Sequence, residues 1–462
     1  MKSELNPSTL TISSAHDFLA EDIISVEEIS EACLRRIEKL NPILNAFITI
    51  LEDKARTETI NISAKGNTGL PLYGIPVAVK DLYETKGILT TSGTLFFKDY
   101  FPEEDCVVVR KLKNAGAIIT GKTNTHEIAL GVTGINPHYG VCHNPWDVKC
   151  ISGGSSSGST VAVATGMSLA AMGTDTGGSI RIPASLCGIV GLKPTFGRVS
   201  LRGITPLSWN LDHAGPLTKS VRDAAILLQI IAGYDSLDPG SANVPVEDFS
   251  IGLKESLKGW KIAVASSGYV EESDSEILDA VNESAKAFES LGAEVVNENM
   301  DVLRNLALAN GRMVQADAAA FHRERLSSHP DWFGADIRER LEAGRSLSST
   351  DYTLARRTQI EGRRHLEMMF QKYDLLILPT TPITAPLIER TDAVEQAGRL
   401  TRFTAPFNLT GLPALSLPCG FDSKGLPIGL QLVSGPWKER TIIDAGHAYE
   451  SATDWHRKFP LI

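Results

Sequence analysis

The sequence predicts an α/β protein, and features of its second half carry that prediction. The segments 260–265 and 374–379 are apolar runs ended by turn residues, which is typical of buried strands. Between them, the ranges 273–292 and 303–327 have the spacing of helices. The chain of 462 residues contains no internal repeat, low-complexity tract or linker that would divide it.

A helix is predicted near the N-terminus. Ser25 and Glu28 have the spacing of a capping box, in which each side chain accepts a hydrogen bond from the other residue's backbone N–H. Apolar residues then recur at helical spacing, at Val26, Ile29, Cys33 and Ile37. We expect residues 1–60 to be mainly helical and to pack on the main body.

The next predicted strand, 77–79, ends at a lysine. Pro76 suits the first position of a strand, and Lys80 follows the apolar run directly. A lysine in apolar surroundings loses solvation of its charged form, so its pKa falls and the neutral amine becomes accessible. To act as a base near neutral pH, its pKa must fall by about three units, a free-energy difference of roughly 4 kcal/mol. An ordinary solvated lysine at a strand end is the alternative.

Two loops rich in glycine and serine, 153–159 and 173–183, are the most informative part of the sequence. A small-residue helix at 160–166 and a short buried strand at 168–172 separate them, so a flexible linker fits poorly. Dense glycines let backbone N–H groups converge on one point, as an oxyanion site requires, and the serines can supply a nucleophile. The loops lack the motifs of phosphate-binding and dinucleotide-binding loops.

Together these segments resemble the amidase signature hydrolases, and the resemblance covers nearly the whole chain. The matching segments, in order, are 74–81, 121–124, 153–159, 173–183, 187–195, 197–200, 212–217, 378–382 and 425–431. The resemblance implies the amidase signature fold, a mixed central β-sheet covered by helices on both faces (α/β/α). It also implies one domain over residues 1–462, with the catalytic core at about 60–240 and the substrate-pocket segment at about 300–400.

By this resemblance, Lys80, Ser155 and Ser179 match the family's lysine, cis-serine and nucleophilic serine. The peptide bond between Gly154 and Ser155 is then expected to be cis. Ser179 would attack the amide carbonyl while its proton passes through Ser155 to neutral Lys80, and water would hydrolyse the acyl-enzyme. We expect no metal and no other cofactor.

The loop before the nucleophile is the expected oxyanion hole. Its donors would be the backbone N–H groups of Thr176, Gly177, Gly178 and Ser179. Asp175 and Arg181 flank this loop with opposite charges, and we expect them to hold it rigid by hydrogen bonds rather than to react.

Competing chemistries find less support. None of the ten histidines lies in a Gly-x-Ser-x-Gly elbow, and neither His-Glu-x-x-His nor Cys-x-x-Cys occurs. A non-catalytic binding protein with the same fold is a further alternative. Such a protein would be expected to lack one of Lys80, Ser155 and Ser179, and all three are present.

The substrate is less well determined. The candidate substrate-binding residues are Thr125, Trp209, Met313 and Phe321, joined by Trp332 and Phe333. Such a lining would suit a mostly apolar or aromatic group, and core packing is the alternative for these side chains. Amides, carbamates and short esters all present a carbonyl that the relay could attack.

The nearest alternative within the family is the glutamine-hydrolysing component of the tRNA-dependent amidotransferase. The resemblance implies that an Arg and an Asp hold glutamine in that protein. An ungapped comparison puts Gln359 and Thr401 at those positions, where neither charge is present. Arg356, Arg357 or Arg363 could replace the arginine, and the balance favours a stand-alone amidohydrolase.

Composition limits the partners. A net charge of −10 argues against affinity for nucleic acid or anionic membranes, and no run of eighteen apolar residues occurs. Residues 1–6 lack the apolar core of a secretion signal, and the six cysteines lack redox or zinc spacing. We expect a cytoplasmic protein with free thiols that acts on a small-molecule amide or carbamate, and a homodimer is compatible with these features.

Overall fold

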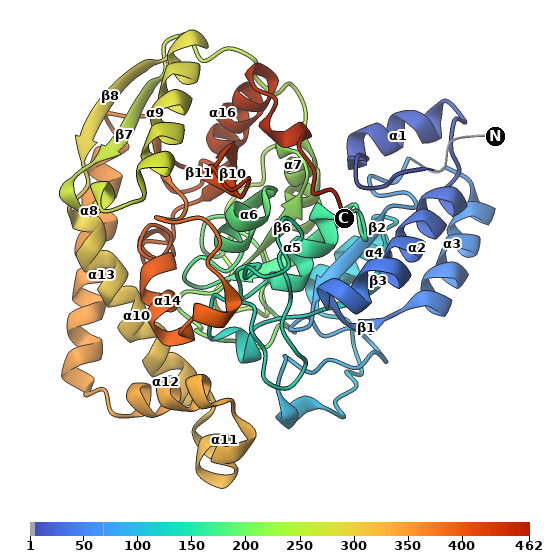
Figure 1. The fold of residues 1–462 in the computed structure, drawn as a ribbon, viewed down its shortest axis with the longest axis horizontal. Coiled ribbons are helices and arrows are strands. Elements are labelled where there is room, and N and C mark those ends of the chain that lie inside the picture. Colours follow the sequence, from blue (N-terminus) through green and yellow to red (C-terminus); the bar gives the residue numbers. More distant parts are fainter. Residues whose placement is uncertain (1–4, 68) are drawn as a thin grey trace.

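The computed structural model describes residues 5–67 and 69–462 (Figure 1). Residues 1–4, which the expectations for the N-terminal segment and the single domain include, lie outside the described residues, as does residue 68. Within the described part, no helix is long and apolar enough to cross a membrane. All six cysteines are free and buried.

An 11-stranded sheet runs through the described chain in the order β1-β3-β2-β4-β6-β5-β10-β11-β9-β7-β8. The strands are β1 Phe47–Ile50, β2 Pro76–Lys80, β3 Ile118–Thr123, β4 Ala170–Asp175, β5 Val190–Lys193, β6 His213–Thr218, β7 Lys261–Ser266, β8 Glu294–Asn299, β9 Leu375–Pro379, β10 Ala414–Phe421 and β11 Pro427–Val433. Strands β3, β2 and β4 are parallel to one another, and so are β9, β7 and β8. Between these two groups, from β4 through β6, β5, β10 and β11 to β9, neighbouring strands are antiparallel. The expected mixed α/β sheet is confirmed.

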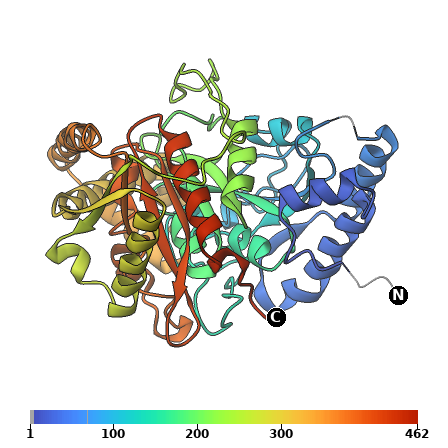
Figure 2. The same cartoon turned by 90° about the horizontal axis from the view of Figure 1, so that it is seen from above.

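Helices surround this sheet (Figures 1 and 2). They are α1 Ile12–Ala20, α2 Val26–Leu44, α3 Glu52–Lys65, α4 Val107–Asn114, α5 Ser157–Ala164, α6 Arg181–Cys187, α7 Val221–Ile231, α8 Gly268–Glu271, α9 Ser275–Ser290, α10 Val302–Phe321, α11 Arg323–Ser328, α12 Ala335–Arg345, α13 Ser349–Met369, α14 Ala393–Leu400, α15 Ala405–Leu409 and α16 Glu439–Ala452.

The alternation of side chains along β2 shows that helices cover both faces of the sheet. Val77 and Val79 pack in the core cluster that holds the apolar residues of α4, α7 and α16. Ala78, between them, packs in the cluster that holds Leu34 and Ile37 of α2 and the apolar residues of α5. Because successive strand residues point to opposite faces, the two groups of helices lie on opposite sides of the sheet.

The N-terminal helix begins as the sequence predicts. Ser25 caps α2, and Ser25 and Glu28 accept hydrogen bonds from each other's backbone N–H groups at 3.2 and 2.8 Å. The range 303–327 was expected as one helix, but it divides at His322 into α10 and α11. His322 departs from helical geometry (φ −96°, ψ 9°) although no Gly or Pro marks the break.

The strand topology brings Lys80 and the two serine loops together at one edge of the sheet. Strands β2 and β4 are parallel neighbours, so Lys80 at the end of β2 lies beside the end of β4. The loop after β4 carries residues 176–179 and leads into α6. The loop before α5 carries Ser155, and the backbone N–H of Ser156 donates to the Ser179 carbonyl at 3.1 Å. That bond ties the two serine loops together.

Candidate active site

Lys80 and Ser155 are in direct contact. The Lys80 Nζ lies 2.7 Å from the Ser155 Oγ and 2.7 Å from the Thr174 Oγ1, and all three residues are buried. The peptide bond between Gly154 and Ser155 is cis, as expected. The sequence did not single out Thr174, although it lies within one of the two serine loops.

The electrostatics around Lys80 suit a base. Burial lowers the pKa of Lys80 from 10.5 to about 7, against the attraction of Asp175 and Asp212, which raises it. Burial also raises the pKa of Asp212 to about 6. Near neutral pH, a substantial share of Lys80 is therefore the neutral amine, which can accept a proton.

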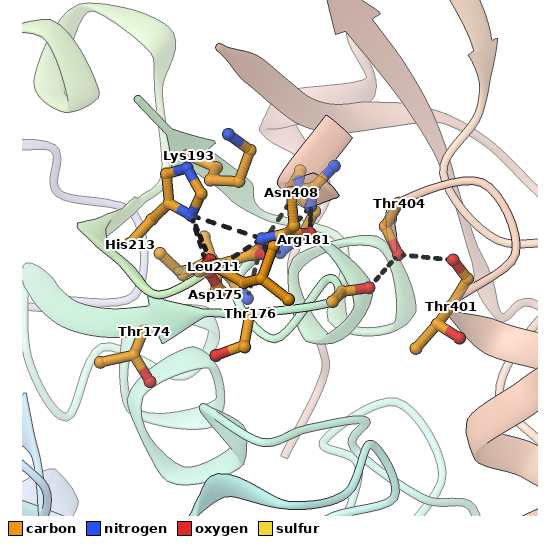
Figure 3. Close-up of polar contacts among 12 residues, drawn as sticks. Thr174, Asp175, Thr176, Arg181, Lys193, Leu211, His213, Thr401, Thr404 and Asn408 are labelled. Atoms are coloured by element: carbon orange, nitrogen blue, oxygen red, sulfur yellow. Dashed lines mark hydrogen bonds and ion pairs between the residues drawn. The ribbon is translucent and has the colours of Figure 1, made fainter. Parts of the chain in front are cut away.

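The loop 176–179 keeps its carbonyls engaged and its N–H groups free. The Thr176 carbonyl accepts from Asn310 at 3.3 Å, the Gly177 carbonyl from the Thr404 hydroxyl at 2.6 Å, and the Gly178 carbonyl from the Ile182 N–H at 2.7 Å. Figure 3 shows Thr404 reaching this loop. Each carbonyl shares a peptide plane with the next residue's N–H, which points the opposite way.

The N–H groups of Gly177, Gly178 and Ser179 are therefore directed away from those anchors. Among the described residues, no acceptor binds them. Free, fixed N–H groups beside a serine are what an oxyanion needs. Gly178 has a φ of +134°, a conformation that only glycine adopts easily.

Asp175 and Arg181 form a buried ion pair that anchors the same loop (Figure 3). The Arg181 Nε and Nη2 donate to the two Asp175 carboxylate oxygens at 3.0 and 2.9 Å. Arg181 also donates to Gln431 at 2.6 Å and to Asn408 at 2.7 Å, and Asn408 donates back to Asp175 at 2.8 Å. Burial alone would raise the pKa of Asp175, but Arg181 holds it below the ordinary range. With every polar atom of the pair bonded, a positioning role fits this geometry.

His213 lies against this network, where its surroundings favour the neutral imidazole. Its Nδ1 lies 2.7 Å from the Leu211 carbonyl and 3.1 Å from the Asp175 carbonyl (Figure 3), and these two acceptors favour a proton on Nδ1. Burial and then Lys193 lower its pKa well below the ordinary value. Among the described residues, no group of three or more His, Cys, Asp or Glu side chains is placed to hold a metal ion.

A cavity of about 490 Å³ opens at Ser179, which lines it together with Thr176 and Gly177. Its other walls come from the loop 129–132, from α10, α12 and α14, and from Tyr269. The polar side chains that line it include Arg304, Asn310, Arg312, Gln315, Arg340 and Thr401.

The substrate-pocket residues suggested by the sequence lie elsewhere. Thr125 and Met313 are fully buried, and neither they nor Phe321 line this cavity. Trp209 lines a second cavity of about 300 Å³, which reaches Thr174 and Asp212. The Phe321 ring packs edge-on against the Trp209 ring, with 6.0 Å between the ring centroids. These four residues are therefore not gathered at the Ser179 cavity, whose α10 wall carries Arg304, Leu308 and Arg312, and their part in substrate binding stays a prediction.

Comparison with known proteins identifies the family. The family profile described as Amidase matches residues 28–443. The chain belongs to the amidase signature family. It is 38% identical to the A subunit of the glutamyl-tRNA(Gln) amidotransferase of Geobacter metallireducens, over 97% of this chain and 98% of that protein.

Solved structures agree with this assignment. An amidase crystal structure matches with a TM-score of 0.86 and 35% identity, covering 96% of this chain and 99% of the other. A chain from a vestigial protein complex, studied for the evolutionary origins of an s-triazine catabolic enzyme, matches with a TM-score of 0.90 and 32% identity over 96% and 98%. This amidase signature hydrolase therefore has the fold that its sequence motifs predict.

Proposed function

We propose that this protein hydrolyses carbon–nitrogen bonds of small amides through an acyl-enzyme on Ser179. One observation carries the proposal. Lys80, with a pKa of about 7, contacts the Ser155 hydroxyl beside a loop that holds Ser179 and unpaired backbone N–H groups. This arrangement supplies a base, a proton relay, a nucleophile and an oxyanion site.

In the first half of the reaction, the Ser179 Oγ attacks the substrate carbonyl. Its proton moves to the Ser155 Oγ, whose own proton moves to the neutral Lys80 Nζ. The N–H groups of Thr176, Gly177, Gly178 and Ser179 stabilise the oxyanion, each by roughly 3–4 kcal/mol in the transition state. The reverse relay protonates the departing amine, which leaves the acyl group as an ester on Ser179.

In the second half, water attacks that ester through the same relay, and the carboxylic acid is released. No step requires a metal. Carbamates and short esters present a similar carbonyl to Ser179, so the same relay would accept them.

The direct test combines covalent labelling with a substrate panel. A fluorophosphonate should label the wild-type protein on Ser179 and leave Ser179→Ala unlabelled, while EDTA should leave the hydrolysis of primary amides and p-nitroanilides unchanged. Labelling of Ser179→Ala on Ser155 or Ser157 would overturn the assignment. Loss of activity in EDTA that zinc or manganese restores would overturn the metal-free reaction.

Similarity to curated relatives favours a second candidate, the glutamine-hydrolysing component of a tRNA-dependent amidotransferase. The charges expected for glutamine are missing at the compared positions. Gln359 is buried and donates to the Leu409 carbonyl at 2.7 Å, while Thr401 lines the cavity. Arg356, Arg357 and Arg363 do not line it. Ammonia release from glutamine only when partner proteins are added would favour this candidate over the stand-alone amidase.

A further inference from the structure

The cavity at Ser179 is positively charged although the protein is negatively charged. Arg304, Arg312 and Arg340 line it, and no Asp or Glu is among the described residues that line it. The whole chain has a net charge of −10. The cavity therefore departs from the average surface in the sign of its charge, at the place where the reacting serine lies.

The helix α10 produces this lining through its periodicity. One face of α10 lines the cavity at helical spacing, with Arg304, Leu308, Arg312 and Gln315. The small residues Ala307 and Gly311 lie between them and fill little of the cavity. A Cβ at Gly311 would meet open space, as it would at Gly398 on α14, which also lines the cavity. Small residues thus leave room for a ligand between the arginines.

Among the residues that the structure describes, two of the three arginines lack an ion-pair partner. Arg304 forms an ion pair with Glu272 at 2.8 Å, and Glu272 also binds Arg402 at 2.6 Å. Within the described residues, neither Arg312 nor Arg340 forms an ion pair. Among the described residues, these two guanidinium groups therefore have no carboxylate at ion-pair distance, and Arg312 attracts Asp351 only at longer range.

One hydrogen bond holds Arg340 in place and leaves other N–H groups of its guanidinium available to a ligand. Its Nη1 donates to the Leu130 carbonyl at 2.7 Å, and Leu130 itself lines the cavity. Asp336, one turn earlier on α12, attracts Arg340 but pairs with His126 at 3.1 Å. Arg340 is part-buried, and a guanidinium carries five N–H donors in a rigid fork. Such a fork matches the two oxygens of a carboxylate, and partial burial strengthens that pairing because less water competes.

We infer that the substrate of this site is an anionic amide, a small molecule that carries a carboxylate bound by Arg340 and Arg312 while Ser179 attacks its amide carbonyl. This inference rests on the proposed function and adds the substrate's charge to it. A zwitterion such as glutamine fits less well, because none of the lining residues that the structure describes has a carboxylate to receive an ammonium group.

Binding to Ser179→Ala protein tests the inference without requiring turnover. Isothermal titration calorimetry should show that glutaramate, a carboxylate on the acyl side, binds at least tenfold more tightly than neutral valeramide. A second pair, 4-acetamidobenzoate and acetanilide, tests a carboxylate on the amine side. We expect at least one charged member to exceed its neutral partner tenfold, and glutamine to bind more weakly than glutaramate.

Variants of α12 test which residue causes the preference for the charged member of a pair. Arg340→Gln in the Ser179→Ala background should reduce the ratio of charged to neutral affinity to less than threefold. The matched control is Arg338→Gln, because Arg338 lies on the same helix, pairs with Asp331 at 2.9 Å and does not line the cavity; this variant should keep the preference.

Four results would overturn the inference. The first three are equal binding of charged and neutral members in both pairs, a preference unaffected by Arg340→Gln, and glutamine binding as tightly as glutaramate. Absence of binding by either carboxylate at millimolar concentration would also overturn it. Fluorophosphonate labelling of wild-type Ser179 is scored separately, so failure of the proposed chemistry and failure of the anionic-substrate inference give different results.

Discussion

Removing the Lys80 amine should change how stability depends on pH. In the native state the pKa of Lys80 is about 7, against an ordinary value of 10.5. Between these two values the unfolded chain binds a proton that the native protein does not. The stability of the wild-type protein therefore rises with pH in this window, by up to roughly 1.4 kcal/mol for each pH unit.

Lys80→Met removes that dependence and keeps a side chain of similar length. Below pH 7 the charged amine is buried in the wild-type protein at the full penalty of roughly 5 kcal/mol, which methionine avoids. The variant also loses the hydrogen bonds to Ser155 and Thr174, at a cost that does not change across this window. From pH 7.5 to 9.5, the free energy of unfolding of the wild-type protein should gain roughly 2.5 kcal/mol relative to the variant.

The assay is urea unfolding followed by tryptophan fluorescence at both pH values. The matched control is Lys86→Met, which removes an exposed lysine shortly after the same strand and should follow the wild-type protein at both pH values. A stability difference between Lys80→Met and the wild-type protein that is the same at pH 7.5 and 9.5 would refute the reasoning. It would mean that Lys80 is solvated, and the proton relay would lose its base.

Five further outcomes are expected. The rate of wild-type amide hydrolysis should rise with pH through about 7 as Lys80 loses its proton. Lys80→Arg should lose several orders of magnitude in kcat at every pH, since arginine keeps its proton. Near-native rates in that variant would exclude the base role of Lys80. Ser155→Ala should lower kcat by orders of magnitude while Ser179 still reacts with a fluorophosphonate, and an unchanged kcat would remove Ser155 from the relay. Gly178→Ala should abolish turnover, because its φ is +134° and a Cβ would collide with Thr404, whereas Gly177→Ala makes only ordinary contacts; equal rates in the two variants would contradict this view of the loop. Arg181→Ala should destabilise the protein by roughly 3–5 kcal/mol in thermal or urea unfolding, because it leaves a buried carboxylate unpaired, and a loss below about 1 kcal/mol would contradict the buried pair.

The parts of the fold and of the site that the sequence predicts are those encoded in short segments. The capping box at Ser25 and the apolar strand before Lys80 depend on residues only a few positions apart, and the structure contains both. The family motifs place Lys80 and Ser155, and the structure puts them in contact. The nucleophilic role of Ser179 stays a prediction until it is labelled.

Local sequence patterns did not predict the residues that support the site. Asn408 bonds to Asp175 across 233 positions of sequence, and Thr404 bonds to Gly177 across 227. Neither residue belongs to a recognisable pattern, because its role depends on where α15 packs. The break of the helix at His322 escaped prediction for a similar reason, since no local helix breaker occurs there.

The sequence alone determined the α/β class, the family and the residues proposed for the chemistry. These depend on periodicity and on motifs whose meaning lies in adjacent residues. Only the tertiary structure decided the pKa of Lys80 and the charge of the cavity. A pKa depends on burial and on charges brought near by folding, and the sequence does not show which of many arginines face a common space. Helix packing, rather than residue type, selects the side chains that line the cavity at Ser179, and it places Arg304, Arg312 and Arg340 there.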